Sequence, residues 1–173
     1  KIMVKPKKIL ITGVAGFIGF HLAKYLIKKN YKIIFLDNIN NYYSVSLKKD
    51  RIKILKDLSK KNFYFFKLNI CKYNNFSILH KFKIDYIFHL AAQALVRRSH
   101  DDPLETWHTN VLGTLHVLEA LRKLDKSCAA VIITSDKCYD NVEWVWGYRE
   151  TDAMGGQDPY SASKGAAELA IRS

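Results

Sequence analysis

The stretch that decides the fold is residues 7–37, KKILITGVAGFIGFHLAKYLIKKNYKIIFLD. Its first six residues, 7–12, are rich in β-branched side chains, end at a glycine and predict a buried strand. The apolar residues that follow recur at helical spacing up to Asn30, and residues 32–37 form a second apolar run that ends in an acid. The stretch therefore predicts a strand, a glycine-rich turn, a helix, a second strand and a terminal carboxylate.

Three glycines in this turn, Gly13, Gly16 and Gly19, have the spacing G-x-x-G-x-x-G. The first permits a tight turn, the second lets the backbone approach a pyrophosphate, and the third lets the helix pack closely on the sheet. Unpaired N–H groups at the helix start, at Phe17 and Ile18, favour a bound anion. The strand and helix on either side favour a dinucleotide site, and the alternative is that the glycines serve only a tight turn.

Asp37 closes the second strand eighteen residues beyond Gly19, with Asn38 directly after it. A carboxylate at this position can accept hydrogen bonds from both ribose hydroxyls and would repel a 2′-phosphate, which favours NAD over NADP. We assign Asn38 to the same site. The alternative is an ordinary acid in a turn, because Asp-Asn-Ile-Asn-Asn is rich in turn-forming residues.

The rest of the chain continues the alternation of strands and helices. Further strands are expected at residues 62–69, 85–92 and 129–135. Further helices are expected at residues 47–58, 103–123 and 159–172. This order predicts an α/β fold with a Rossmann-like, doubly wound parallel sheet. No linker rich in proline, glycine or serine interrupts residues 1–173, so we expect a single domain.

Composition narrows the possible classes of protein. The chain has 173 residues, 49% of them hydrophobic, which is enough for one core. No apolar run approaches the roughly eighteen residues of a membrane helix, so no membrane partner is expected. The cysteines, Cys71, Cys128 and Cys138, form no C-x-x-C motif, which fits a reducing, cytoplasmic location. The scattered histidines argue against a metal site.

Charge is distributed unevenly along the chain. Residues 1–88 carry 19 Lys and Arg against 4 Asp and Glu, a net charge of +15, whereas residues 89–173 carry 9 against 12, a net charge of −3. A basic half could bind nucleic acid or an acidic partner. These lysines stand between apolar residues at helix and strand spacing, which favours a solvated surface, and no nucleic-acid partner is expected.

Tyr160 and Lys164 are spaced four residues apart, which places both side chains on one face of a helix. An ammonium there stabilises the tyrosine phenolate, lowers a pKa that is about 10 in water, and can hold the nicotinamide ribose. Tyr160 can then accept a hydroxyl proton as hydride leaves the same carbon. This Y-x-x-x-K pair and the G-x-x-G-x-x-G turn together resemble the extended short-chain dehydrogenases/reductases.

Longer segments resemble two subfamilies of these enzymes. The second half is similar to CDP-glucose 4,6-dehydratases over HLAAQALVRRS (89–99), DPLETWHTNVLGTLHVLEA (102–120), TSDKCYDNVEWVWGYRE (134–150) and GGQDPYSASKGAAEL (155–169). The first half is similar to UDP-uronate 4-epimerases over GVAGFIGFHLAKYL (13–26) and DNINNYYSVSLKKDR (37–51). The chain thus resembles the NAD-dependent nucleotide-sugar epimerases and dehydratases.

The resemblance implies further cofactor contacts. It assigns six more residues to the NAD cleft or its edge: Asn69, Ile70, Ala91, Ala92, Gln93 and Asn110. Asn69 stands where relatives carry an aspartate that touches the adenine. An amide can still bond the adenine amino group through its oxygen.

The resemblance also implies a reaction, through Ser135, Asp136 and Lys137. Other sugar-nucleotide 4,6-dehydratases carry Thr-Asp-Glu here, and CDP-glucose enzymes carry Lys in place of Glu. Tyr160 and NAD would oxidise carbon 4, Lys137 would remove the carbon-5 proton, and Asp136 would protonate the hydroxyl leaving carbon 6. The alternative for Asp136 and Lys137 is a solvated ion pair in a loop.

The expected partners follow from the same resemblance: a nucleotide sugar, either CDP-glucose or a UDP-sugar, and a second copy of the chain packed through residues 104–122 and 160–172. Relatives add a C-terminal substrate-binding domain, which these 173 residues do not contain, so the fold is expected to be truncated before that domain. A UDP-uronate or UDP-hexose 4-epimerase stays an alternative. So does a non-catalytic module, either a truncated NAD-binding domain or a basic nucleic-acid binder.

Overall fold

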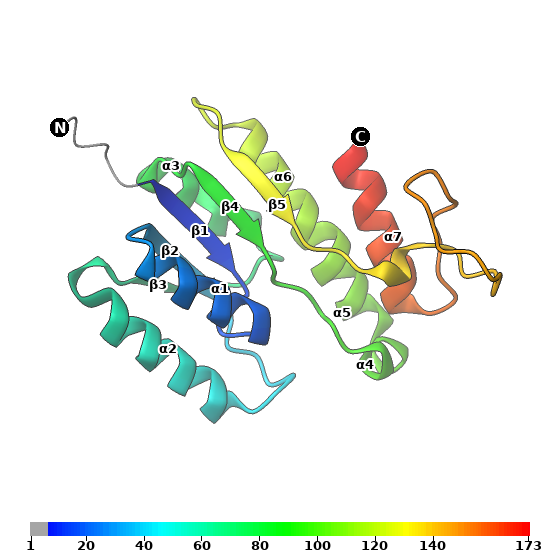
Figure 1. The fold of residues 1–173 in the computed structure, drawn as a ribbon, viewed down its shortest axis with the longest axis horizontal. Helices are drawn as coiled ribbons and strands as arrows, with labels where there is room; N and C mark the ends of the chain where they lie inside the picture. Colours follow the sequence, from blue (N-terminus) through cyan, green and yellow to red (C-terminus); the bar gives the residue numbers. More distant parts are fainter. Residues whose placement is uncertain (1–6) are drawn as a thin grey trace.

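The computed structural model describes residues 7–173, apart from the side chain of His80. Five parallel strands form one sheet in the order β3-β2-β1-β4-β5 (Figure 1). The strands are β1 (Lys8–Thr12), β2 (Lys32–Asp37), β3 (Tyr64–Lys67), β4 (Tyr86–His89) and β5 (Ala129–Ile132). This order confirms the predicted Rossmann-like, doubly wound sheet.

Helices connect the strands and extend beyond the last of them. The α-helices are α1 (Phe17–Lys28), α2 (Val45–Ser59), α3 (Ile78–Phe82), α4 (Val96–Asp101), α5 (Pro103–Trp107), α6 (Gly113–Arg122) and α7 (Pro159–Arg172). The short helical turns are η1 (Lys60–Asn62), η2 (Tyr73–Ser77), η3 (His108–Leu112) and η4 (Asp136–Cys138). Of these, η3 is π-helical and joins α5 to α6, so the long helix expected at residues 103–123 is present with a widened turn at its centre. Among the described residues, no helix is both long and apolar enough to cross a membrane.

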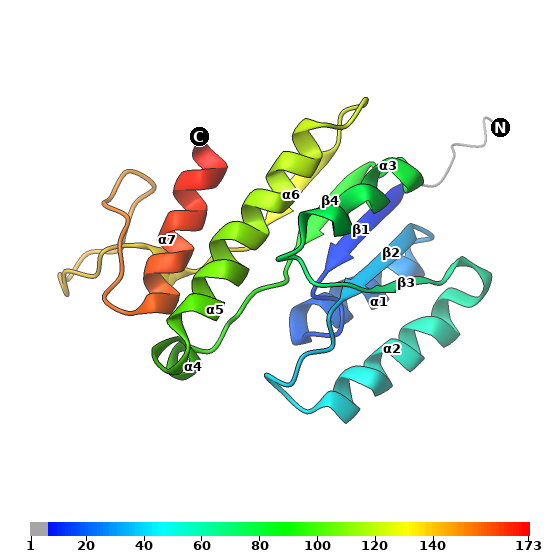
Figure 2. The same ribbon diagram turned by 180° about the vertical axis from the view of Figure 1, so that it is seen from behind.

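The alternation of side chains along β1 and β2 creates two cores. Ile9, Ile11 and Phe35 face α1 and α2, in a cluster that also buries Leu55. Their sequence neighbours point to the opposite face, where Leu10, Ile34 and Leu36 pack with buried residues of α3 and α6. Figure 1 shows β5 in front of α6, and Figure 2, from behind, shows α6 in front of β5. The sheet is therefore the middle layer of three.

Strand β1 lies at the point where the chain order reverses, because it pairs with β2 on one side and β4 on the other. In open α/β sheets, ligands bind in the crevice beyond the carboxyl ends of the strands at such a point. The predicted glycine turn follows β1 directly. The fold therefore places that turn where a ligand is expected.

Candidate functional site

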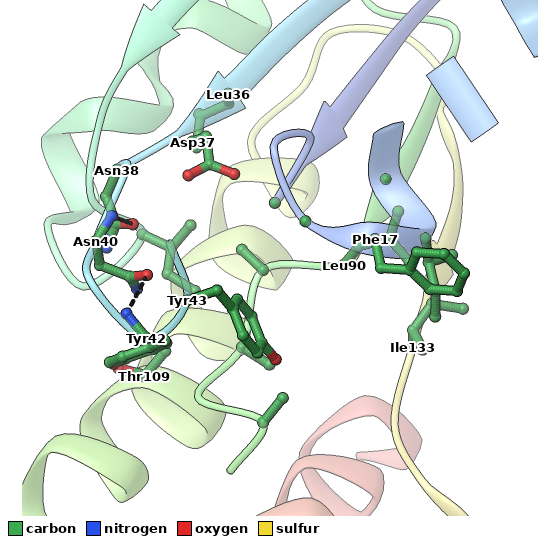
Figure 3. Close-up of a pocket in the computed structure, with 18 of the residues that line it drawn as sticks. Phe17, Leu36, Asp37, Asn38, Asn40, Tyr42, Tyr43, Leu90, Thr109 and Ile133 are labelled. Carbon is green, nitrogen blue, oxygen red and sulfur yellow. Dashed lines mark hydrogen bonds between the residues drawn. The ribbon is translucent and has the colours of Figure 1, made fainter. Parts of the chain in front are cut away.

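A cavity of ≈ 360 Å³ opens at the carboxyl ends of the strands (Figure 3). Most of the predicted cofactor residues line it: Gly13, Gly16, Phe17, Ile18, Gly19, Asp37, Asn38, Ile70, Ala91, Ala92, Tyr160 and Lys164. Figure 3 shows Asp37 and Asn38 at one end of this cavity, with Phe17 and Ile133 at the other. The two halves of the sequence thus contribute to one site.

The glycine turn is held tightly between β1 and β4. Gly13 has a φ of +70°, and a Cβ there would lie 2.7 Å from the backbone N of Ala91. Gly13 also accepts a hydrogen bond of 3.0 Å from the N–H of Gly16, and a Cβ at Gly19 would collide with the same carbonyl of Gly13. A side chain is thus excluded by sterics at Gly13 and Gly19, which keeps the turn tight against the start of α1.

The start of α1 has no partner of its own for its first N–H groups. Gly16 is the N-cap residue and offers no side chain, and the first turn of the helix contains no acid. The N–H groups of this turn and the positive end of the helix dipole therefore suit a phosphate. A dinucleotide pyrophosphate fits this cradle.

Asp37 is the buried carboxylate of the site, with 5% of its surface exposed. Its Oδ2 accepts the N–H of Ala15 at 2.9 Å, and its Oδ1 accepts the N–H of Ile39 at 2.8 Å. Each carboxylate oxygen has a second lone pair, so both can accept a further hydrogen bond from a ribose diol. The carboxylate is therefore fixed in place and still able to bind.

Tyr160 and Lys164 are both buried on α7, one turn apart, and both line the cavity. The Nζ of Lys164 donates to the carbonyl of Ile133, at the end of β5, at 3.3 Å. Burial lowers the pKa of Lys164 to about 8, against the opposing effect of the Glu168 carboxylate. The pKa of this amine is thus well below its usual value, although the amine is still mostly charged at pH 7.

Gln93 and Asn110 lie beside the cavity but do not line it. Asn110 accepts the backbone N–H of Gln93 at 2.8 Å and donates to its carbonyl at 3.0 Å and to the Oγ of Ser163 at 2.9 Å. Gln93 in turn donates to the Oγ1 of Thr106 at 2.9 Å. These two amides therefore join the loop after β4, the π-helical turn and α7. A direct contact with a cofactor stays a prediction for both.

A buried histidine that the sequence did not suggest stabilises the same region. Thr12 Oγ1 accepts the N–H groups of Leu90 and Ala91 at 3.1 Å each, so its hydroxyl donates to His89 Nδ1 at 2.7 Å. Complete burial, with Lys164 nearby, lowers the pKa of His89 to about 3, so the ring is neutral. Its Nε2 then carries the hydrogen and donates to the Oγ1 of Thr114 at 3.3 Å. The only sequence signal was a polar residue closing each of two buried strands.

The predicted acid and base lie on η4, directly after β5. Ser135 Oγ accepts the N–H of Lys137 at 3.2 Å and donates to Asp136 Oδ1 at 3.0 Å. The side chains of Asp136 and Lys137 are exposed and do not line the cavity, although Thr134 before them does. No ion pair between Asp136 and Lys137 is present within residues 7–173. Their catalytic roles stay a prediction.

Helix α7, which carries Tyr160 and Lys164, nevertheless lies close to η4. Helix α7 packs against η4, and a Cβ at Gly165 would lie 3.0 Å from the carbonyl of Cys138. That carbonyl also accepts the N–H of Gly155 at 2.9 Å. The close approach at Gly165 brings the Ser135–Lys137 turn alongside the helix that carries Tyr160 and Lys164.

The loop between β2 and α2 contributes cavity residues that the sequence analysis did not single out. Asn40, Tyr42 and Tyr43 of this loop line the cavity together with Lys48 of α2, and Figure 3 shows Tyr42 beside Thr109. This loop reaches α4, where the guanidinium of Arg98 lies 4.8 Å from the centre of the Tyr42 ring. Burial, with the Glu105 carboxylate nearby, raises the pKa of Tyr42 to about 12.

Asn69 lies outside the main cavity, in an adjoining one of ≈ 460 Å³ that also contacts Asn38, Lys67 and Lys72. Asn69 Oδ1 accepts the N–H of Cys71 at 2.9 Å, which leaves a second lone pair on that oxygen. Its contact with an adenine stays a prediction. Within the described residues, no group of three or more His, Cys, Asp and Glu side chains could hold a metal ion.

Comparison with known proteins identifies the family. Residues 10–173 match the family described as GDP-mannose 4,6 dehydratase. A CDP-glucose 4,6-dehydratase of Salmonella typhimurium is 61% identical over 89 residues, which cover 51% of this chain and 25% of that protein. A UDP-glucuronate 4-epimerase of Thermodesulfobacterium geofontis is 32% identical over 161 residues, which cover 92% of this chain and 49% of that protein.

The solved structures give the same result. The UDP-glucuronic acid 4-epimerase of Bacillus cereus, solved with UDP-glucuronic acid and NAD, has a TM-score of 0.82 and 28% identity, covering 95% of this chain and 51% of that one. The chain thus spans about half the length of this relative. Both resemblances expected from the sequence are confirmed among these proteins. The chain belongs to the GDP-mannose 4,6 dehydratase family, within the extended short-chain dehydrogenases/reductases.

Proposed function

We propose that this chain is the NAD-binding unit, residues 1–173, of a sugar-nucleotide 4,6-dehydratase whose substrate is CDP-glucose. The observation that carries the proposal is the Ser135-Asp136-Lys137 turn, which follows β5 and is held against the helix of Tyr160 and Lys164. The 61% identical stretch shared with the Salmonella CDP-glucose enzyme supports this substrate class. A 4-epimerase has no use for an acid and a base at this position.

NAD fits the residues of the cavity. The open N–H groups at the start of α1 suit its pyrophosphate, and the buried Asp37 carboxylate suits the diol of its adenosine ribose. When bound, NAD supplies the acceptor for hydride from carbon 4 of the sugar and the donor that returns it to carbon 6. The Bacillus cereus relative was solved with NAD, which supports this choice.

Tyr160 and Lys164 handle the proton of the carbon-4 hydroxyl. Tyr160 accepts this proton, because its phenol lines the cavity with the Lys164 ammonium one helical turn away. With a pKa of about 8, Lys164 is mostly charged at pH 7 and stabilises the phenolate. The carbonyl of Ile133 holds its Nζ at 3.3 Å, which orients the ammonium.

Elimination of water then depends on η4. The carbon-4 ketone acidifies the proton on carbon 5, which Lys137 removes as a base. Asp136 protonates the hydroxyl that leaves carbon 6, and Ser135 orients the Asp136 carboxylate through its hydrogen bond of 3.0 Å. The proton and the hydroxyl that leave together as water are thus removed by two residues of one turn, Lys137 and Asp136.

Exchange with solvent tests this reaction. A 4,6-dehydratase removes the carbon-5 proton, so CDP-glucose turned over in deuterated water should yield a product with deuterium at carbon 5. A 4-epimerase, the alternative favoured by the relative that matches 92% of the chain, leaves that hydrogen in place. A product with no deuterium at carbon 5 would exclude the dehydratase.

We expect the chain to bind NAD at least tenfold more tightly than NADP, a difference of about 1.4 kcal/mol. The reason is the buried Asp37 carboxylate, which would lie against a 2′-phosphate. Isothermal titration calorimetry with each dinucleotide measures the ratio. Equal affinities would show that Asp37 does not contact the ribose.

We also expect a homodimer at micromolar concentration. Leu104 and Trp107 on α5 and Leu169 on α7 expose 77%, 40% and 55% of their surfaces, apolar area that a second copy of the chain would cover. Light scattering should show a dimer, and Leu104→Asp should shift it to monomer. Leu47→Asp, at a 45% exposed leucine on α2, is the control and should remain dimeric. A monomeric wild-type protein contradicts this expectation.

A further inference from the structure

Lys48 differs from the other lysines of α2 because it is buried. Only 4% of its surface is exposed, whereas Lys49, Lys53 and Lys56 on the same helix face solvent. Its side chain lines the main cavity at the end that also contains Asp37. A cation thus lies next to the carboxylate that is expected to select the cofactor.

The surroundings of the Lys48 ammonium satisfy it only in part. Its Nζ donates to the backbone carbonyl of Asn40 at 3.0 Å and to the Asn40 side-chain oxygen. The rings of Tyr43 and Tyr42 lie 5.6 and 6.0 Å away. An ammonium has three donors, and two of them are used by Asn40. Within residues 7–173, no hydrogen bond uses the third donor.

Lys48 also has no ion-pair partner within residues 7–173. A buried charge without such a partner is costly unless other groups solvate it. Burial lowers the pKa of Lys48, Arg51 nearby acts in the same direction, and the charge of Asp37 opposes both. Arg51 itself is committed to the glycine turn, where it donates to the carbonyl of Ala15 at 3.0 Å. Of these two cations, Lys48 lines the cavity and Arg51 does not.

We propose that Lys48 is a second cofactor-specificity residue, which donates to the adenosine ribose and would attract a 2′-phosphate. This inference rests on the proposed function. Asp37 and Lys48 flank the same end of the cavity with opposite charges, so the repulsion of a 2′-phosphate by Asp37 is partly offset. The carboxylate alone then separates this NAD site from one that accepts NADP.

The test is a double-mutant cycle measured by calorimetry with NAD and NADP. Asp37→Asn keeps the size of the side chain and an oxygen that can accept a backbone N–H, and it removes the negative charge. We expect it to raise the affinity for NADP relative to NAD at least tenfold. Adding Lys48→Met should remove most of that gain, at least fivefold, because the attracting ammonium is lost. Thermal unfolding of each variant verifies that it is folded.

Lys49→Met is the matched control, because it removes the same charge from an exposed position on the same helix. In the Asp37→Asn background, Lys49→Met should leave the NADP gain within twofold. If Lys48→Met leaves the gain intact, or if Lys49→Met removes it equally, Lys48 is not the specificity residue and the inference is wrong. In either case the proposed function stands. A wild-type protein that binds neither dinucleotide overturns both.

Discussion

Replacing Lys164 by methionine is expected to stabilise the folded protein by about 2 kcal/mol at pH 7 while abolishing turnover. Burial lowers the pKa of Lys164 from 10.5 to about 8, a difference that costs the charged form about 3 kcal/mol on folding. Methionine keeps the length of the side chain without the charge, and it loses one long hydrogen bond to Ile133, worth about 1 kcal/mol. Turnover should fall at least 100-fold because the phenolate of Tyr160 loses its counter-charge.

The pH dependence of the stability gained by Lys164→Met is a second test of whether the charged amine destabilises the folded protein. Between about pH 8 and pH 10.5 the unfolded chain binds more protons at Lys164 than the folded chain does, so the wild-type protein gains stability as pH rises. The advantage of Lys164→Met should be complete below about pH 8 and vanish towards pH 10.5. Chemical denaturation at several pH values measures it. Lys137→Met, at an exposed lysine, is the control and should change stability little. A Lys164→Met protein less stable than wild type at pH 7 contradicts the account.

Lys137→Met is expected to separate the first half of the reaction from the second. In the proposed reaction, oxidation at carbon 4 depends on Tyr160 and Lys164, so a 4-keto sugar should still form. Exchange of the carbon-5 hydrogen with deuterated water should fall about 100-fold or more, since the base is gone. Nuclear magnetic resonance of the sugar measures both quantities in the whole enzyme. Tyr160→Phe is the control and should prevent both.

Exchange and product formation at wild-type rates in Lys137→Met would show that this residue is only a loop cation. Lys137 is exposed in the structure, as a loop cation without a catalytic role would be, so the experiment separates the two roles. The dehydratase would then be supported only by the similarity of the surrounding loop. The 4-epimerase would become the better proposal.

The first βαβ unit was predictable because each of its sequence signals depends only on neighbouring residues and agrees with the overall fold. The glycines of the turn, the helical spacing up to Asn30 and the acid at Asp37 each act over a few residues, and the structure places all of them as expected. The three later strands, in contrast, end earlier than predicted. The expected strand at 85–92 stops at His89; beyond it, the N–H groups of Leu90 and Ala91 donate to the Thr12 hydroxyl, and that of Leu90 also to the Thr12 carbonyl.

Features that depend on distant pairs could not be predicted. The spacing of apolar residues does not change at the π-helical turn, so the sequence does not mark it. The Asn110 amide within this turn donates a hydrogen bond to Ser163, 53 residues away. Lys48 illustrates a different limit. The lysine-rich first half fits a solvated surface, and a pattern of charge does not reveal which single lysine the β2–α2 loop covers.

Elimination of water from a nucleotide sugar distinguishes the proposed dehydratase from an epimerase, and the identity of the product shows whether it occurs. The whole enzyme should be incubated with NAD and, in parallel, with CDP-glucose or UDP-glucuronate, and the sugar nucleotides analysed by mass spectrometry for the loss of water and by nuclear magnetic resonance for the configuration at carbon 4. We expect CDP-glucose to lose one water and become a 4-keto-6-deoxy sugar, while UDP-glucuronate keeps its mass and configuration. Conversion of UDP-glucuronate to its 4-epimer, with CDP-glucose unchanged, would contradict it.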